Sequence, residues 1–319
     1  MTAIKQHFDS AREALEKAGT VLLTTHERTD GDDLGSVLAM AHHLQSSGKN
    51  IHVVVKGGVP EQLRYLPGSD IVTEIFPEGK IDVAVISGCS NISRVGLPEL
   101  ENLNATIINI DHHPDNSLYA DINVVDAAKS AVAELTFDFF EHTGWPITSA
   151  IATCLLTGII TDTGVFMHSN TKDTTLNAAA NLMRKGARIS TITKHTYQGK
   201  NIEGLKAWSK ALENAQYDPA QRMIYTILTE EELSDMGNPP LEYFEGIVET
   251  LNKVPEARFA LFLKQDQNMI KGSLRSDPHK GVNVKEIAHL FGGGGHKWAA
   301  GFSVVGKLEK TDQGRWQVI

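Results

Sequence analysis

The stretch Ala105-Thr-Ile-Ile-Asn-Ile-Asp-His-His-Pro114 decides how this chain is built. It opens with an apolar run of strand length, and the Asp111-His112-His113 triplet follows without a gap. Ligands bind beyond the carboxyl ends of the strands in open α/β sheets, so the triplet stands where functional side chains gather. A buried structural histidine pair is the alternative interpretation. The acidic motif that begins at His26 argues against it, because it offers further metal-ligating side chains.

Three other apolar runs of strand length precede this stretch, at residues 21–26, 51–55 and 81–86. Helical or turn segments separate them, and one helix is expected over residues 33–47. Continuous apolar runs of this kind are typical of a parallel sheet that is buried on both faces. The sequence therefore predicts an α/β fold for the N-terminal part of the chain, with a parallel sheet flanked by helices.

The length of the chain predicts a second domain. A prior of roughly 150 residues per domain suggests two domains for 319 residues. After helices at 130–142, 146–162 and 173–185, the polar stretch 188–199 lacks a clear apolar face. We predict a first domain at 1–187, a linker with a helix at 188–215, and a smaller α+β domain at 216–319. That domain should contain strands at 223–228, 257–264 and 268–274 and helices at 241–251 and 284–291.

Composition argues against several classes of function. The formal net charge is −9, whereas coating long nucleic acid needs a basic stripe, which this sequence lacks. No apolar run approaches the roughly 18 residues of a membrane span, so the sequence predicts a cytoplasmic protein that binds neither long nucleic acid nor a membrane. The two cysteines, Cys89 and Cys154, fit neither a disulfide framework nor a metal-binding Cys-x-x-Cys pair, and we expect both to be reduced.

The motif His26-Glu-Arg-Thr-Asp30-Gly-Asp32-Asp33 follows the first predicted strand. It places an imidazole and alternating carboxylates in one loop, where two acids could flank two cations. The alternative is an acidic turn that caps the next helix, for which Asp32 or Asp33 would be an ordinary choice. Taken alone, the motif supports the two interpretations equally.

A single acid, Asp162, ends the apolar helix that is predicted over residues 146–162. An ordinary polar residue at a helix end is the alternative interpretation. The helix dipole disfavours an acid at this end unless a cation offsets its charge. A bound metal ion would supply that offset, so Asp162 joins the candidate ligands.

Two glycine-containing segments near the C-terminus complete the pattern. Gly272-Ser-Leu-Arg275-Ser276 is followed by Gly292-Gly-Gly-Gly-His296-Lys-Trp-Ala-Ala-Gly301. Glycines let backbone N–H groups approach phosphate oxygens closely. With the three motifs described above, these segments resemble the DHH phosphoesterases. The resemblance covers nearly the whole chain and is to the stand-alone group with a DHHA1 domain, which includes nanoRNases, oligoribonucleases and phosphoadenosine-phosphate phosphatases.

The resemblance implies a role for each matched residue. His26 and Asp30 would hold one metal ion, and a second would be held by Asp32, His112 and Asp162. Mixed imidazole and carboxylate ligands suit Mn²⁺, with Mg²⁺ or another divalent ion as alternatives. His113 would face the phosphate, and Asp111 would orient an imidazole. Across the interdomain cleft, the far end of the substrate would be bound by Arg275, Ser276, Gly293, Gly294, Gly295 and His296.

One segment departs from the family pattern. Residues 86–96 end in Arg-Val-Gly as in the family, and this alignment puts Gly88 where the family has the Asp that bridges both metals. Glycine has no ligand to offer, Cys89 and Asn91 are weak ligands, and Asp33 is expected to point away because adjacent residues diverge. We therefore expect three ligating carboxylates rather than four and one weak metal position, which the substitution Gly88→Asp would strengthen.

Two classes of function remain. The favoured one is a metal-dependent phosphodiesterase or phosphatase that acts on short oligoribonucleotides or small phosphorylated nucleotides, with activity reduced by the change at Gly88. A soluble cyclic-dinucleotide phosphodiesterase is a variant of this class. The alternative is a catalytically weakened relative that binds nucleotides. Retention of the other site residues favours an enzyme, and the sequence leaves open its physiological substrate and whether it forms a homodimer.

Overall fold

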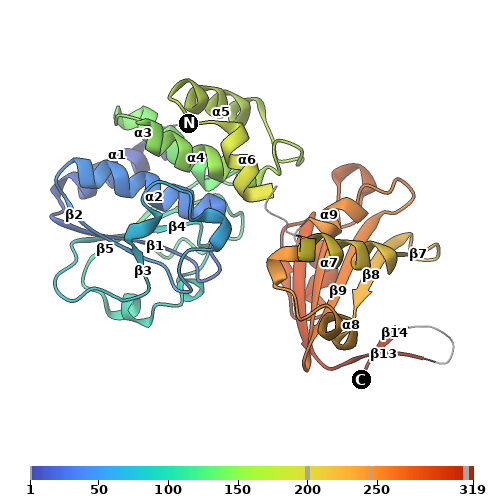
Figure 1. The fold of residues 1–319 in the computed structure, drawn as a ribbon. Coiled ribbons are helices and arrows are strands. Elements are labelled where there is room, and N and C mark those ends of the chain that lie inside the picture. Colours follow the sequence, from blue (N-terminus) through green and yellow to red (C-terminus); the bar gives the residue numbers. More distant parts are fainter. Residues whose placement is uncertain (1, 198–201, 245, 312–315) are drawn as a thin grey trace. The chain divides into compact units, whose positions relative to one another are not determined.

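The chain folds into two compact units, Met1–Gly199 and Lys200–Ile319, and each is described by itself. The structure, a computed structural model, describes residues 2–197, 202–244, 246–311 and 316–319 (Figure 1). No helix in these described segments is long and apolar enough to cross a membrane.

A six-stranded sheet, parallel throughout, forms the centre of the first unit, which confirms the predicted α/β fold. In the order in which they lie side by side, its strands are β3 (Val72–Thr73), β2 (Asn50–Val54), β1 (Thr20–Thr25), β4 (Val83–Ser87), β5 (Thr106–Asp111) and β6 (Ile122–Val125). The chain runs from β1 to β2 on one side and later to β4 on the other. The strand order therefore reverses between β1 and β4, which is where open α/β sheets bind their ligands.

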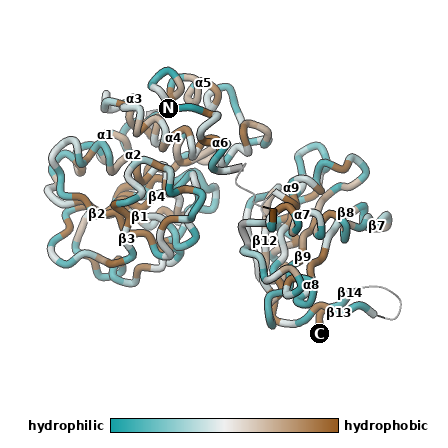
Figure 2. The backbone as a smooth tube through the Cα atoms, viewed as in Figure 1, coloured by the Kyte–Doolittle hydropathy of each residue, from teal (hydrophilic) through white to brown (hydrophobic). Residues whose placement is uncertain are grey.

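The two faces of this sheet are covered differently. Side chains alternate between the faces of a strand, so Val21 and Leu23 of β1 pack among the helices while Leu22 belongs to a second apolar cluster. Short 3₁₀ helices and loops close this second cluster, with Val95 and Leu100 among its buried residues. The strands are hydrophobic along most of their length in Figure 2. The helices of the unit are α1 (Thr2–Lys17), α2 (Gly31–Ser46), α3 (Val132–Thr143), α4 (Ser149–Asp162), α5 (Asp173–Arg184) and α6 (Ile189–Tyr197).

The predicted linker at 188–215 contains two helices in the structure. Helix α6 buries Ile192 in the core of the first unit, so the polar stretch does have one apolar contact face. Helix α7 (Ile202–Glu213) buries Ala207 and Ala211 in the core of the second unit. Residues 198–201, between the two helices, lie outside the described residues.

The second unit is a mixed α+β domain, as the sequence predicts. Its sheet has the order β11 (Gly294–Gly295), β12 (Ala299–Val305), β10 (Met269–Ser276), β9 (Phe259–Asp266), β8 (Met223–Leu228) and β7 (Gln216–Asp218). Strands β8 and β9 are parallel, and the other neighbours are antiparallel. The other elements are α8 (Glu230–Asp235), α9 (Ile247–Leu251), α10 (Val284–His289) and a separate pair of strands, β13 (Leu308–Lys310) and β14 (Trp316–Val318).

Candidate metal centre

The start of helix α2 is fixed by Asp30. Its carboxylate accepts hydrogen bonds from the backbone N–H groups of Asp32 (2.9 Å) and Asp33 (3.2 Å), which makes Asp30 the N-cap. Neither Asp32 nor Asp33, the capping candidates in the sequence, occupies that position. Because Asp32 and Asp33 are consecutive residues of the helix, their side chains leave its first turn in different directions.

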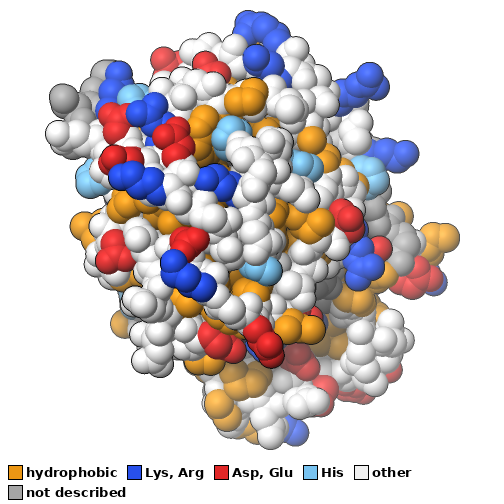
Figure 3. All heavy atoms as spheres, turned by 90° about the vertical axis from the view of Figure 1, so that its left-hand side faces the viewer, with side chains coloured by type: hydrophobic (Ala, Val, Ile, Leu, Met, Phe, Trp, Pro, Cys, Tyr) orange, Lys and Arg blue, Asp and Glu red, His pale blue; other side chains and the backbone are white. Residues whose placement is uncertain are grey.

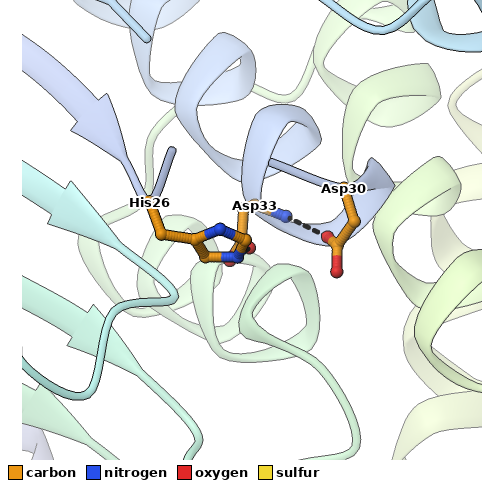
Figure 4. A group of neighbouring side chains, drawn as sticks. All are labelled: His26, Asp30 and Asp33. Atoms are coloured by element: carbon orange, nitrogen blue, oxygen red, sulfur yellow. Dashed lines mark hydrogen bonds and ion pairs between the residues drawn. The ribbon is translucent and has the colours of Figure 1, made fainter. Parts of the chain in front are cut away.

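A first group of potential ligands consists of His26, Asp30 and Asp33, whose ligand atoms all lie within 4.8 Å of one another. His26 follows β1, and its Nε2 lies 2.5 Å from Oδ2 of Asp33 (Figure 4). The prediction that Asp33 points away from the site is therefore wrong. Asp32 and Asp33 do diverge, but the start of α2 lies between two ligand groups, so each acid reaches a different group.

The second group consists of Asp32, His112 and Asp162, also within 4.8 Å of one another. His112 Nε2 lies 3.8 Å from Asp162 Oδ2, while its Nδ1 donates to the carbonyl oxygen of Lys129 at 3.2 Å. A carbonyl oxygen only accepts, so the hydrogen is on Nδ1 and the Nε2 lone pair is available to a metal ion. The sequence-predicted residues of this group are thus brought together from α2, the end of β5 and the end of α4.

Asp32 is held by the first turn of α3. Its two oxygens accept hydrogen bonds from the N–H groups of Val132 (2.7 Å) and Ala133 (2.8 Å). The close approach needs a glycine on α4, because a Cβ at Gly158 would lie 2.7 Å from Asp32 Oδ1 and 2.5 Å from the Cβ of Ala133. The sequence analysis missed Gly158, although a glycine inside an otherwise apolar helix often marks a packing contact.

Asp111 orients the second histidine of the triplet. Its carboxylate is fully buried and accepts a 2.6 Å hydrogen bond from Nδ1 of His113 and a 2.5 Å bond from Asn116. Burial alone would raise the pKa of Asp111, but these donors and the backbone N–H of His113 hold it below its usual value. A buried, ionised Asp111 therefore fixes the ring of His113, while His112 is fixed by a backbone carbonyl.

The electrostatics of the two groups fit divalent cations. Burial raises the pKa of Asp32 to about 6, and burial together with neighbouring acids raises the pKa values of Asp33 and Asp162 well above normal. Burial lowers the pKa of His26, which keeps its imidazole in the neutral, ligating form. Clustered buried carboxylates are costly unless cations compensate their charge, and this mixture of imidazole and carboxylate is a donor set for Mn²⁺-like ions.

Gly88 stands directly beside Asp33. Its backbone has φ +64°, and its N–H donates to the carbonyl of Ile110 at 2.9 Å, at the end of β5. A Cβ built on Gly88 would lie 1.4 Å from Oδ1 and 2.4 Å from Cγ of Asp33. The nearby Cys89 is no substitute ligand, since burial raises the pKa of its thiol to about 11 and its Sγ donates to the carbonyl of Asn91 at 3.0 Å. Beside the three carboxylates that the sequence predicts, Asp33 offers a fourth that could bind a metal ion.

The substrate-binding candidates of the second unit lie on β10 and around β11, two strands that β12 separates. Arg275 of β10 is paired with Ala299 of β12, and the glycines of β11 pair with the other side of β12. Arg275 Nε lies 2.8 Å from Glu249 Oε1, and its Nη1 donates to Leu274 O at 2.9 Å. Ser276 is buried, and its hydroxyl donates to Arg258 O at 2.8 Å, inside the unit.

The glycine turn itself is geometrically constrained. Gly295 has φ +132°, and a Cβ there would lie 2.6 Å from the carbonyl oxygen of Ala299. At Gly293 a Cβ would lie 2.2 Å from the carbonyl oxygen of Gly301, whereas Gly294 has open space beside it. His296, at the end of the turn, is exposed. The roles of these residues in binding stay predictions.

Comparison with known proteins agrees with this arrangement. Residues 20–159 match the N-terminal domain of the DHH family, and residues 244–313 match the DHHA1 domain. A Thermus thermophilus protein named bifunctional oligoribonuclease and PAP phosphatase NrnA is 32% identical over 90% of this chain and 85% of its own. The Bacillus subtilis protein of that name is 28% identical, with 89% of each chain covered.

Solved structures agree on the architecture. An exopolyphosphatase-related protein from Bacteroides fragilis is 26% identical, with a TM-score of 0.86 and coverage of 93% of this chain and 90% of that chain. RecJ from Thermus thermophilus, solved in complex with Mn²⁺, shares the fold with a TM-score of 0.54 at 15% identity, over 94% of this chain and 52% of its own. From both domain matches and the 32% identical relative, we conclude that the chain belongs to the DHH family of phosphoesterases, with a C-terminal DHHA1 domain.

Proposed function

We propose that this protein is a metal-dependent phosphoesterase that hydrolyses short oligoribonucleotides or small phosphorylated nucleotides. The observation that carries the proposal is the pair of ligand groups at the carboxyl ends of the parallel strands, with a histidine held by a buried carboxylate next to them. The names of the relatives from Thermus thermophilus and Bacillus subtilis, oligoribonuclease and PAP phosphatase, support the substrate class.

Two divalent ions, with Mn²⁺ as the favoured one, would supply an activated water and positive charge for the phosphate. His26, Asp30 and Asp33 would hold one ion, and the other would be held by Asp32, His112 and Asp162. These six residues come from four segments of the first unit. Three of them are oriented by hydrogen bonds: Asp30 as the N-cap of α2, Asp32 at the first turn of α3, and His112 at the carbonyl of Lys129.

His113 and Asp111 would act on the substrate. Because Asp111 accepts from Nδ1 of His113, it fixes the orientation of the ring. In its protonated form, a histidine held in this way can donate a hydrogen bond from Nε2 to a phosphate oxygen and stabilise charge that develops on it. His113 is 20% exposed and Asp111 is fully buried, so only the histidine is within reach of a ligand.

Arg275 would bind a terminal phosphate of the substrate. Its contacts with Glu249 and with the carbonyl of Leu274 use two of the five N–H donors of the guanidinium group and hold its plane in place. On the face shown in Figure 3, Lys and Arg side chains are scattered among Asp and Glu and form no basic stripe. This supports a substrate with few phosphates rather than a long strand.

Hydrolysis assays with Mn²⁺ test the proposal. A two-nucleotide RNA, a 3′,5′-bisphosphorylated adenosine, a cyclic dinucleotide and a long RNA would be compared. We expect turnover of one of the first two, loss of that turnover in EDTA, and its loss in Asp162→Asn. Turnover of the cyclic dinucleotide alone would assign the variant substrate class. A protein that binds Mn²⁺ but hydrolyses none of these substrates would contradict the proposal in favour of a nucleotide-binding relative.

A further inference from the structure

Compared with the family pattern, this chain lacks an acid at position 88 and has an additional acid at position 33, and the two positions are neighbours in the site. The family resemblance puts a shared, metal-bridging Asp at position 88, and this chain has Gly88. The chain also has an extra acid, Asp33, directly after the motif residue Asp32. The two positions are 55 residues apart in sequence (88 − 33), yet the carboxyl group of Asp33 lies against the backbone of Gly88.

We propose that Asp33 supplies the metal-binding carboxylate that position 88 lacks, as a ligand of the group at His26, and that Gly88 leaves the space which makes this possible. The ligand has moved from the loop after β4 to the first turn of α2. The identity of the ions rests on the proposed function, but the exchange of one ligand for another does not depend on catalysis.

Space excludes a side chain at 88 while Asp33 is in place. The three atoms nearest to a Cβ built on Gly88 are Oδ1 (1.4 Å), Cγ (2.4 Å) and Oδ2 (3.1 Å), all from the carboxyl group of Asp33. The carboxylate of Asp33 thus occupies the space that the Cβ of a residue at 88 would need. Asp33 and any residue larger than glycine at 88 are therefore alternatives, which explains why the gain and the loss occur together.

Asp33 belongs to the first ligand group, and acids of the second group act on it electrostatically. It is only 3% exposed and pairs with His26 of the first group. Asp30 of the first group and Asp32 and Asp162 of the second all act electrostatically on its carboxyl group. A buried acid among other acids is costly without a cation, and the closeness of Asp33 to His26 and Asp30 gives it the position of a ligand of the first group.

With this exchange, the two groups have the same number and kinds of potential ligands. With Asp33 included, each group has three residues, one imidazole and two carboxylates. Without Asp33, the group at His26 would keep one imidazole and one carboxylate. The inference therefore replaces the expectation of one strong and one weak position by two positions of comparable strength.

Five variants of the full-length protein test the exchange: Asp33→Asn, Asp33→Ala, Gly88→Asp, and Asp33→Ala combined with either Gly88→Asp or Gly88→Ala. Asp33→Asn keeps the shape of the side chain and removes its charge. The two double variants put the same Cβ at 88 and differ in the carboxylate. Asp is among the residues that tolerate positive φ better than most. Mn²⁺ affinity and stoichiometry would be measured by calorimetry, and folding by circular dichroism and melting temperature.

We expect both single variants at 33 to fold and to bind Mn²⁺ at least tenfold more weakly, since losing even an outer-shell partner of a ligand costs about 10- to 100-fold. Asp33→Ala with Gly88→Asp should recover most of the affinity, and Asp33→Ala with Gly88→Ala should not. Gly88→Asp alone should lower the melting temperature and weaken Mn²⁺ binding, because the two side chains collide.

Two results would overturn the inference. One is a folded Asp33→Asn protein that binds Mn²⁺ as tightly and in the same number as the unaltered protein. The other is a folded Asp33→Ala, Gly88→Asp protein that binds no better than its Gly88→Ala counterpart. Metal binding decides both, so a protein that shows the exchange but hydrolyses nothing would contradict the proposed function and leave this inference intact.

Discussion

Asp111 accepts a hydrogen bond from the imidazole of His113 and not from that of His112. The two adjacent histidines can therefore have different roles. His113 Nδ1 donates to Asp111, whereas His112 Nδ1 donates to the carbonyl of Lys129. Loss of the Asp111 carboxylate should therefore disturb the ring of His113 more than the ring of His112, which we propose as a metal ligand.

The variant Asp111→Asn is expected to lower kcat for a dinucleotide by about 10- to 100-fold, the usual effect of losing a partner that orients a site histidine. Its Mn²⁺ affinity should stay close to that of the unaltered protein. Steady-state kinetics and calorimetry on the same preparation check both statements. If Mn²⁺ affinity fell as far as turnover, Asp111 would have to be counted among the metal ligands.

Glu134 is a buried acid outside the two ligand groups that holds the segment around Lys129. It accepts hydrogen bonds from Thr174 and Thr175 (2.8 Å each) and from Lys129 Nζ at 3.1 Å. Burial alone would raise the pKa of Glu134, but these donors and the N–H of Ser130 bring it below its usual value. A lowered folded-state pKa stabilises the fold above the unfolded-state pKa, and this contribution disappears as pH falls through the folded value.

Glu134→Gln should therefore lower the free energy of unfolding at pH 7 by about 1.5 to 3 kcal/mol, the range for hydrogen bonds to a charged group. The difference between the two proteins should shrink below roughly pH 4, where the unfolded-state carboxyl is protonated. Urea denaturation at several pH values measures it. A difference that stays constant down to acid pH would show that the charge of Glu134 contributes nothing.

At the scale of elements, the site depends on how closely α4 packs against α2 and α3. Glycines make this approach possible: a Cβ at Gly35 would lie 2.4 Å from Cys154 O, and one at Gly158 would meet both Asp32 and Ala133. The packing brings Asp162, at the end of α4, to Asp32 and His112.

Gly158→Ala is expected to destabilise the protein by about 1 to 3 kcal/mol, the usual cost of overpacking a core. It should also weaken Mn²⁺ binding, because the new methyl group displaces the Asp32 carboxylate. Chemical denaturation and calorimetry measure the two effects. Unchanged values for both would mean that α4 shifts without disturbing the ligands.

In the second unit, Arg275 is expected to recognise the substrate and not the metal. Arg275→Ala should raise KM for a dinucleotide by about 10- to 100-fold, since a charge-assisted contact contributes about 1.5 to 3 kcal/mol. Mn²⁺ affinity should not change. Lys271→Ala is the matched control, because it removes a positive charge from the same face of β10. Equal KM values for the Arg275 variant and the control would remove Arg275 from recognition.

The elements that carry the chemistry could be predicted from the sequence, because β1 and β5 are apolar runs that end directly in the motifs. The edge strands could not: β3 has two residues, and β6 includes the polar Asn123. The direction of the Asp33 side chain could not be predicted, because it depends on which of the neighbouring acids caps α2. Tertiary packing determines which acid does so. The signal was nevertheless present, as an extra acid at 33 and a missing acid at 88.

In the whole molecule, each of the two units contributes different residues to the proposed function. The first contains both ligand groups, and the second contains Arg275 and the glycine turn. The net charge of −9 and the scattered cations of Figure 3 agree with recognition of a short substrate through a few local contacts. We propose that the first unit binds two metal ions through two sets of three residues, with Asp33 in place of an acid at 88.

Anomalous scattering from crystals grown with Mn²⁺ tests this claim most directly. We expect two Mn²⁺ peaks of similar height, one at His26, Asp30 and Asp33 and the other at Asp32, His112 and Asp162, with the Asp33 carboxylate coordinated to metal. A single peak at the second group, with Asp33 still against His26 and not coordinated, would contradict the proposed two-metal site.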